Sequence, residues 1–244
     1  MRTKIGVLAF LMVGIGMTPL NAQDLPLYLD QGTKFSFEHR LFYNYEKHDL
    51  DFDTRGRVTS RSQAAGAAVS YVVADTVQIA LDGGVLLDPE VSNSASTWRG
   101  RSGYFYGIEA VDHIFPATER WPGVTAQVGF SSHVSSFDEQ QTGSSQALID
   151  QRMRDLQYGG SVVASWKLGP LTPYFGPRVT ASDVKWVDNQ PAPGGPSSIE
   201  GHLDKNIGIV AGCTFSILQG LELQIEGRAV GETSIRASIQ WLKY

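Results

Sequence analysis

Only one cysteine, Cys213, occurs in the chain, so an intramolecular disulfide is excluded. The 20 Lys and Arg residues are outnumbered by 25 Asp and Glu residues, which gives a formal net charge of −5. Nucleic-acid binders need a basic surface for phosphate contacts, so the balance of charge argues against that class. Apolar residues are never sustained over the roughly 18 positions that a membrane-spanning helix needs, which argues against a helical membrane protein.

Glycine and aromatic residues are plentiful. The sequence contains 26 glycines, and 10% of its residues are aromatic, a composition that favours many short strands over long helices. With 244 residues, 42% of them hydrophobic, the chain can build one mid-sized domain or two small ones.

The first residues have the layout of an export signal. Arg2 and Lys4 precede an apolar stretch at 5–17, and the small residue Ala22 follows shortly afterwards. This predicts a secretory signal peptide at 1–22, with the mature chain beginning at Gln23. No cysteine follows the cleavage position, which excludes a lipoprotein signal. An uncleaved membrane anchor is the alternative, although the stretch is shorter than the roughly 20 residues of a span.

From residue 34 onward, apolar side chains recur at every second position. In 34–45 they occupy the odd positions, while polar side chains occupy most of the even ones. This is the period of a strand with two chemically different faces. Ten segments show it: 35–45, 65–73, 77–87, 104–110, 124–130, 158–166, 175–181, 207–215, 221–229 and 235–241.

The links between these segments alternate in length. Four long links are expected at 46–61, 88–103, 135–155 and 186–204, and they alternate with short ones, the last being a tight turn at 231–232. A soluble β-sandwich also has alternating strands, but this asymmetry is typical of a transmembrane barrel with short periplasmic turns and long outer loops. The prediction is therefore an all-β fold, a transmembrane antiparallel up-and-down β-barrel of about ten strands, eight being possible. It would occupy 34–244, after a periplasmic segment at 23–33.

Aromatic residues fall near the ends of the predicted strands, as interfacial girdles require. Near the periplasmic ends are Phe35, Tyr71, Trp166, Phe175, Phe215 and Trp241. Near the outer ends are Tyr43, Tyr45, Tyr104, Tyr106 and Phe130. Two residues fit less well: Pro177, which cannot donate to a ladder and would need a bulge, and His39, which falls on the lipid face.

Two stretches carry a resemblance to a known group. Residues 168–176, LGPLTPYFG, form a short turn leading into a strand, and residues 235–244, IRASIQWLKY, form an alternating strand ending in an aromatic residue. The chain thus resembles the small outer-membrane β-barrels of Gram-negative bacteria, including the opacity-type and OmpA-like barrels. In this predicted strand the aromatic residue at a lipid-facing position is Trp241 and not the terminal Tyr244. This differs from the usual C-terminal signal of such barrels. The resemblance implies a monomer in the bacterial outer membrane, with membrane lipids, lipopolysaccharide and the barrel-insertion machinery as partners.

Candidate catalytic and metal-binding residues are few. His133 and Ser135 have the His-x-Ser spacing that resembles outer-membrane lipid A deacylases, in which His activates a Ser nucleophile. That family carries its site on the lipid-facing wall, whereas His133 has the inward parity, and no carboxylate stands at a matching spacing. The acidic stretch 49–56 suggests a calcium loop, but it has Thr54 where glycine is needed and Ser60 where glutamate is needed. The histidines show no metal-ligand spacing. We therefore expect no enzymatic activity, no metal and no cofactor.

The inward charges form the main candidate site. Eight charged residues have the parity opposite to the apolar stripe: Glu38, Arg40, Glu109, Arg178, Glu222, Glu226, Arg228 and Arg236. Balanced charges inside a narrow barrel favour mutual pairing, because an unpaired buried charge costs several kcal/mol. They indicate either a plugged, structural lumen or a narrow selective pore.

Three functions follow from this interpretation. The first is a structural or surface-interaction role with a largely plugged polar lumen. The second is a narrow channel for small polar or amphipathic solutes. The third is an outer-membrane hydrolase similar to the lipid A deacylases or to the ten-stranded omptins, although the sequence lacks a matching aspartate pair and Asp–His pair at the loop bases.

Overall fold

The computed structural model describes residues 36–53, 56–73, 77–189, 198–204, 206–218, 220–229 and 232–243. Within them the chain forms twelve antiparallel strands joined in one sheet. A helix with the length and apolar character of a membrane span is not found among these residues. The predicted signal peptide at 1–22 and the segment at 23–33 lie outside the described residues.

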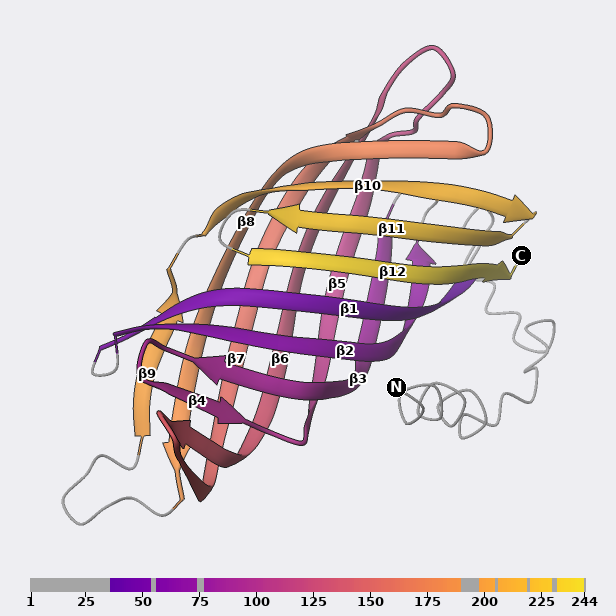
Figure 1. The fold of residues 1–244 in the computed structure, drawn as a ribbon. Helices are drawn as coiled ribbons and strands as arrows, with labels where there is room; N and C mark the ends of the chain where they lie inside the picture. The colour runs from indigo at the N-terminus through magenta and orange to yellow at the C-terminus, as the bar shows by residue number, and fades with distance from the viewer. Residues whose placement is uncertain are drawn as a thin grey trace.

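Ten strands follow one another around a closed ring, and each is antiparallel to the next (Figure 1). The ring closes where the last strand pairs with the first, from Phe37 opposite Lys243 to His48 opposite Glu232. The up-and-down barrel predicted from the alternation is confirmed, with ten strands and not eight. The strands of the ring are β1 (Ser36–Phe52), β2 (Gly56–Val73), β3 (Val77–Ser92), β5 (Ser102–Phe115), β6 (Gly123–Thr142), β7 (Ser145–Ser165), β8 (Leu171–Asp188), β10 (Ile207–Leu218), β11 (Leu221–Ala229) and β12 (Glu232–Lys243).

The two faces of the wall are those that the alternation predicts. Outward side chains are apolar and exposed, with Leu81 and Val128 each 61% exposed and Ile209 57% exposed. Inward side chains such as Asn44 and Thr180 are polar and buried. Apolar surface is thus turned away from the interior, which is the reverse of a water-soluble protein.

The two residues that fitted the pattern poorly are accommodated in different ways. Pro177 lies opposite Ile209 on β10, and the register between β7 and β8 is the same on both sides of it, so the expected bulge is absent there. His39 lies on β1 opposite Trp241 of β12, and the two rings are stacked with centroids 5.8 Å apart. The aromatic ring of Trp241 therefore packs on the imidazole.

The described residues of the four long loops expected at 46–61, 88–103, 135–155 and 186–204 are largely in strands, which corrects the prediction. β1 runs to Phe52 and β2 begins at Gly56, while only residues 143–144 separate β6 from β7. The alternation continues through these residues, but the apolar side chains change face. Tyr43 and Tyr45 of β1 are exposed, whereas Leu50 and Phe52 are buried inside.

The extended strands form a second ring at one end of the barrel. Two short strands complete it, β4 (Ser96–Arg99) and β9 (Ser198–Leu203). Within this second ring β4 lies between β3 and β6 and pairs with both. In the ten-stranded ring, β5 occupies that position between β3 and β6. β9 pairs with β8 and β1, in the place of β10, β11 and β12. The ring therefore narrows to eight strands, β1, β2, β3, β4, β6, β7, β8 and β9, which we call the cap. The opposite end, with turns at 116–122 and 166–170, is called the turn end.

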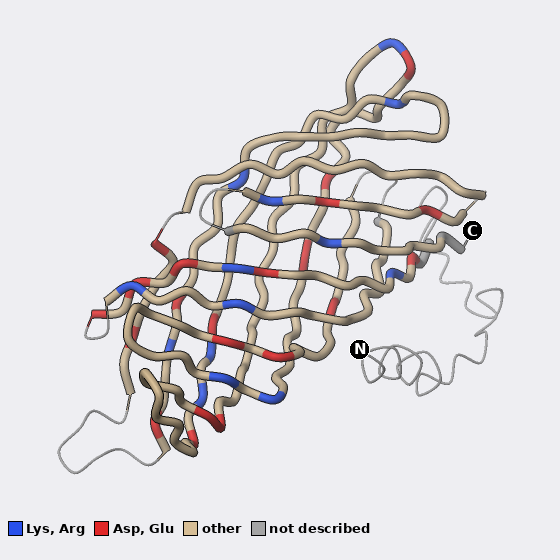
Figure 2. Tube along the Cα trace, viewed as in Figure 1, with Lys and Arg blue, Asp and Glu red and all other residues tan. Residues whose placement is uncertain are grey.

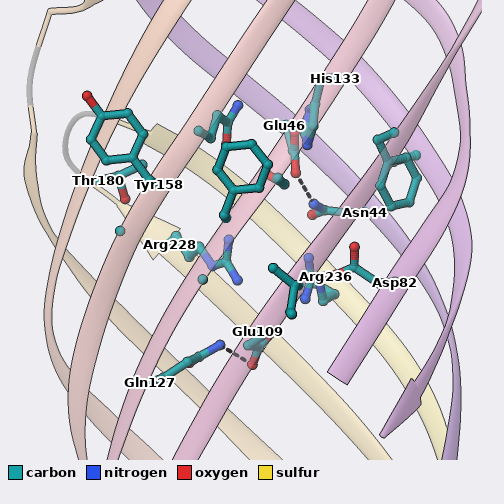
Figure 3. A pocket seen from close by; sticks show the side chains of 18 of the residues that line it. Asn44, Glu46, Asp82, Glu109, Gln127, His133, Tyr158, Thr180, Arg228 and Arg236 are labelled. Carbon is teal, nitrogen blue, oxygen red and sulfur yellow. Dashed lines mark hydrogen bonds and ion pairs between the residues drawn. The ribbon is translucent and has the colours of Figure 1, made fainter. Parts of the chain in front are cut away.

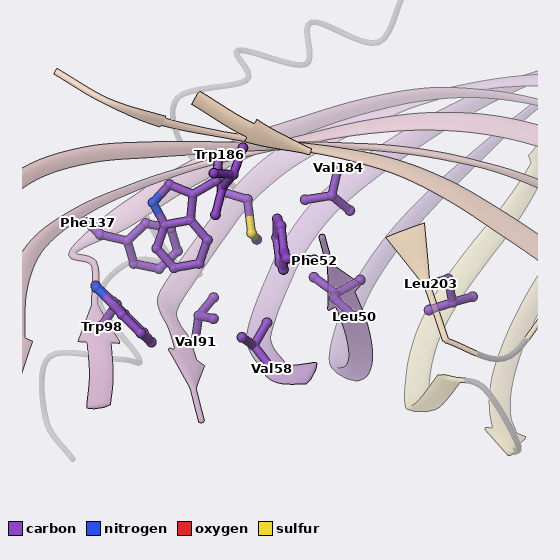
Figure 4. Packing of buried hydrophobic residues seen from close by; sticks show 11 residues of the cluster. Leu50, Phe52, Val58, Val91, Trp98, Phe137, Val184, Trp186 and Leu203 are labelled. Carbon is purple, nitrogen blue, oxygen red and sulfur yellow. The ribbon is translucent and has the colours of Figure 1, made fainter. Parts of the chain in front are cut away.

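An apolar core fills the cap (Figure 4). Trp186 lies at its centre, stacked on Phe137 at 5.3 Å between centroids and edge-on to Trp98 at 5.2 Å and to Phe52 at 5.9 Å. The whole cluster comprises Leu50, Phe52, Val58, Val91, Trp98, Phe137, Met153, Val184, Trp186, Ile199 and Leu203.

Charged residues are frequent along the cap (Figure 2), and the side chains of Arg99 and Arg101 are 57% and 86% exposed. Arg101 lies 2.7 Å from Asp138, and Arg99 lies 3.4 Å from Glu90. An apolar inside and a charged outside suit a structure that stands in water. The cap is thus built with the polarity of a soluble barrel, whereas the ten-stranded ring has the opposite polarity.

Candidate functional site

The lumen below the cap contains a layer of buried polar side chains. Glu46 of β1 lies at the centre, with its Oε2 atom 3.4 Å from Nε2 of His48 and 3.6 Å from Nδ1 of His133. Asn44 donates a hydrogen bond to the other oxygen of Glu46. His133 belongs to β6, and three strands separate β6 from β1 in the ring. The contact between Glu46 and His133 therefore crosses the interior, as Figure 3 shows.

An aromatic pair narrows the lumen at nearly the same level. Phe42 of β1 and Phe105 of β5 approach to 5.7 Å between ring centroids. Both rings lie over Gly66, where a Cβ atom would stand 2.6 Å from Phe105 and 2.8 Å from Phe42. Glycine at this position is what allows the two rings to fill the interior.

The predicted inward charges lie in the next layer. Arg40 of β1 reaches Glu109 of β5 at 3.8 Å, which is a second contact across the interior. Glu226 of β11 accepts hydrogen bonds from Arg228 at 2.8 Å and from the hydroxyl of Tyr174 at 2.9 Å.

The other predicted charges do not all join this network. Arg236 lies opposite Glu226 in the register of β11 and β12, and its guanidinium carbon lies 4.9 Å from the centroid of the Phe42 ring. Arg178 donates a hydrogen bond to Thr180 at 2.9 Å. Glu38 and Glu222 lie near the turn end and are members of neither ion pair.

Cavities remain in the interior between the described residues, and two of them border these polar layers. The larger has a volume of about 500 Å³ and extends from Arg236 to the turn residues Phe115 and Pro116. The smaller has a volume of about 80 Å³ and lies between Asp82, Arg236 and the layer around Glu46 (Figure 3). Water could enter the larger cavity from the turn end, whereas the apolar core closes the end at the cap.

The sequence reasoning missed further charged or titratable lumen residues, among them Glu46, His48, Asp82 and Asp155. Three of them fall in stretches expected to be loops, so the alternation was not used to predict whether their side chains point inward. The signal was present for Glu46 and His48, because they continue the even-numbered face that begins with Glu38 and Arg40. Asp82 has the same inward parity within the predicted strand 77–87.

The weak catalytic candidate is not assembled as a catalytic pair. His133 and Ser135 both point inward, but the described contacts of His133 are with Glu46 and with the ring of Phe105 at 5.7 Å. No hydrogen bond joins His133 to Ser135 in the described part of the chain. Ser135 is 4% exposed, so a substrate has no approach to it from outside.

Metal chemistry receives no support from the described residues. They contain no group of three or more His, Cys, Asp or Glu side chains that could hold a metal ion. In the acidic stretch 49–56, Asp49 accepts a hydrogen bond from Thr59 at 2.8 Å across the β1–β2 hairpin, while residues 54–55 are outside the described part.

Comparison with known proteins gives matches to structures alone. No family model matches the sequence, and no curated protein matches it. Among solved structures, the outer-membrane protease OmpT of Escherichia coli has a TM-score of 0.50 and 8% identity, over 88% of this chain and 99% of that one. The translocator domain of the autotransporter NalP from Neisseria meningitidis has a TM-score of 0.47 and 9% identity, over 100% of this chain and 96% of that one. An outer-membrane channel from Pseudomonas putida F1 has a TM-score of 0.39 and 7% identity, over 90% of this chain and 99% of that one. Likeness at such low identity concerns the fold, and the chain has the fold of the outer-membrane β-barrel proteins.

Proposed function

We propose that this protein is an exported β-barrel of the bacterial outer membrane with a structural or surface-interaction role. It has no enzymatic activity, and its lumen does not conduct. The observation that carries the proposal is the apolar core of the cap, which fills the interior of the eight-stranded ring.

The orientation in the membrane follows from surface polarity. The outward face of the ten-stranded ring is apolar and suits lipid, whereas the charged exterior of the cap suits water. Outward tyrosines mark the boundary near the cap, among them Tyr43, Tyr104 and Tyr106, which are 40–47% exposed. Short turns of such barrels face the periplasm, so the cap stands outside the cell.

The same features weigh against a channel and against a hydrolase. A solute would have to displace the cluster around Trp186 and then the contacts from Glu46 and Arg40 across the lumen. A hydrolase would need a nucleophile open to its substrate, whereas Ser135 is buried beneath the cap. We further propose that its partners are outer-membrane lipids, lipopolysaccharide and the insertion machinery, that it is a monomer, and that its relatives are the opacity-type and OmpA-like barrels.

Conductance of the refolded protein in planar lipid bilayers tests the proposal. We expect silence, because neither ions nor water can pass the packed core of the cap. Stable unitary currents from the wild-type protein would reject the closed lumen in favour of the narrow channel.

A labelling experiment shows whether the cap itself is the seal. A cysteine at Ser135, in a Cys213→Ser background, should resist an impermeant thiol reagent added to intact cells. Adding Trp186→Ala should make that cysteine reactive, because it leaves a large void in the seal. A cysteine at the exposed Ser145 should react in both backgrounds, which controls for expression and folding. Equal reactivity at Ser135 with and without Trp186 would show that the cap does not close the lumen.

A further inference from the structure

The polar layer beneath the cap joins opposite sides of the barrel through two histidines. One oxygen of Glu46 lies 3.4 Å from Nε2 of His48 and 3.6 Å from Nδ1 of His133. Glu46 and His48 belong to β1, whereas His133 belongs to β6. The side chains of all three are at most 13% exposed. Two imidazoles on one buried carboxylate thus connect β1 to β6 through the interior.

A second carboxylate belongs to the same layer. Asp155 of β7 lies directly opposite His133 in the β6–β7 register, so the two side chains are on the same, inward face. Its Oδ2 atom accepts a hydrogen bond from Gln157 at 2.8 Å, but its Oδ1 atom is buried and has no hydrogen-bond partner among the described residues. The same is true of Oδ1 of Asn44. The layer therefore contains two acceptor atoms for which the described part of the chain supplies no donor.

Protonated histidines can supply the missing donors. A neutral imidazole has one N–H donor and one acceptor nitrogen, whereas the charged ring has two donors. When Nε2 of His48 and Nδ1 of His133 donate to Glu46, the other nitrogen of each neutral ring is an acceptor, in a layer that already has surplus acceptors. A proton converts that nitrogen into a donor. The ordinary pKa of histidine, about 6.5, brings this change within the physiological pH range.

The charges around the layer favour the same uptake of protons. Glu46 and Asp155 are both buried, each being 5% exposed. Apart from the two histidines, the cation that acts on Glu46 is Arg236 of β12. Asp82 of β3 is a third carboxylate, and it lies in the field of His133. Negative charge therefore exceeds positive charge around these residues while the rings are neutral.

Charged groups of three further strands border the smaller cavity below this layer and are engaged by other residues. They are Glu109 of β5, which pairs with Arg40, Arg178 of β8, which donates to Thr180, and Arg228 of β11, which pairs with Glu226. Glutamate and arginine ordinarily keep their charge through the range in which histidine titrates. The two histidines are thus the groups whose charge changes there.

We propose that Glu46, His48, His133 and Asp155 form a pH-dependent latch beneath the cap. In acid both rings carry protons, and charge-assisted contacts with the two carboxylates tie β1 to β6 and β7. As the pH rises the rings lose their protons and the carboxylates repel each other, so the tie weakens. The latch therefore stabilises the closed lumen in acid, and this contribution is lost in alkali. It goes beyond the structural role proposed above, which requires only that the cap is filled.

Thermal unfolding of the refolded full-length protein in detergent, at about pH 5.5 and about pH 8.5, tests the latch. The informative quantity is the difference between wild type and variant, because titrations common to both cancel. His133→Gln should lower the unfolding temperature by about 5 °C at the lower pH and by less than about 2 °C at the higher pH. His48→Gln should behave in the same way and replaces it if His133→Gln does not fold. His202→Gln, on the exposed surface of the cap, is the matched control and should shift the temperature by less than about 1 °C at either pH.

A change of the carboxylate partner identifies the cause. In a Glu46→Gln background, the effect of His133→Gln should differ between the two pH values by roughly half as much or less, because the ring has lost its charged partner. A difference between wild type and His133→Gln that does not change with pH, or that is the same in the Glu46→Gln background, would overturn the latch. Bilayer conductance is measured independently, so a conducting protein would reject the closed lumen without deciding whether the latch exists.

Discussion

Each charged residue of the lumen is stabilised by a small number of hydrogen bonds and ion pairs. Glu226 is the best example, since it is 9% exposed and accepts hydrogen bonds from both Arg228 and Tyr174. Three arginines, Arg40, Arg228 and Arg236, lie around the same cavity. The carboxylate of Glu226 therefore offsets part of the positive charge of these arginines.

Replacement of Glu226 by Gln should lower the free energy of unfolding by about 3–5 kcal/mol, because it leaves a buried guanidinium without its partner. Urea titration of the protein folded into lipid vesicles measures this loss. Glu119→Gln, on the exposed turn at 116–122, should change stability by less than about 0.5 kcal/mol. A loss below about 1 kcal/mol for Glu226→Gln would mean that water or another group already compensates the arginine.

At the scale of one strand, adjacent residues of β11 face opposite sides of the barrel wall. Ile225 points outward and is 53% exposed, whereas Gln224 points inward and donates a hydrogen bond to Tyr174 at 2.8 Å. Ile209 on the neighbouring β10 also points outward, on the far side of Cys213 from the turn end. The wall of the barrel is thus one residue thick, with an apolar surface on one side and a polar cavity on the other.

Arginine substitution along β11 should reveal the two faces. Ile225→Arg and Ile209→Arg should each cost about 2–4 kcal/mol of folding free energy in lipid vesicles, because they place a charge near the bilayer midplane. Gln224→Arg should cost distinctly less, since the cavity supplies water and the carboxylate of Glu226. Equal costs at positions 224 and 225 would show that the faces are misassigned.

At the scale of the whole molecule, the described residues form two stacked rings of opposite polarity. The ten-stranded ring is apolar outside and polar inside, while the eight-stranded cap is charged outside and apolar inside. The strands β1, β2, β3, β6, β7 and β8 run through both rings without interruption. One continuous wall therefore joins the part suited to lipid with the part suited to water.

This arrangement predicts both location and orientation. The protein should fractionate with outer membranes and migrate faster on gels before boiling than after, because a closed barrel keeps its backbone hydrogen bonds within the sheet. In a Cys213→Ser background, cysteines at Ser94 or Ser145 should be labelled on intact cells by an impermeant reagent, and a cysteine at Glu119 should not. Labelling at Glu119 alone would invert the orientation, and recovery in the soluble periplasm would exclude the membrane barrel.

The sequence by itself determined which residues share a face, because the period of a strand is two and any apolar stripe marks one side of the wall. It thereby determined the ten strands of the ring. It did not determine the cap. The apolar side chains change face between Tyr45 and Leu50, and in a sequence such a change indicates that a strand has ended. Only the tertiary structure shows that the surroundings change there from an outward apolar wall to an enclosed apolar core.

Partners across the lumen were likewise decided by the tertiary structure. Parity places Arg40, Glu109 and Glu226 inside, but contacts such as Arg40 with Glu109 and Glu46 with His133 join strands that are not neighbours. Which inward residues meet depends on the curvature and stagger of the closed ring, and a pattern along single strands contains neither quantity. The sequence thus set the faces of the wall, and closure of the ring set the contacts inside it.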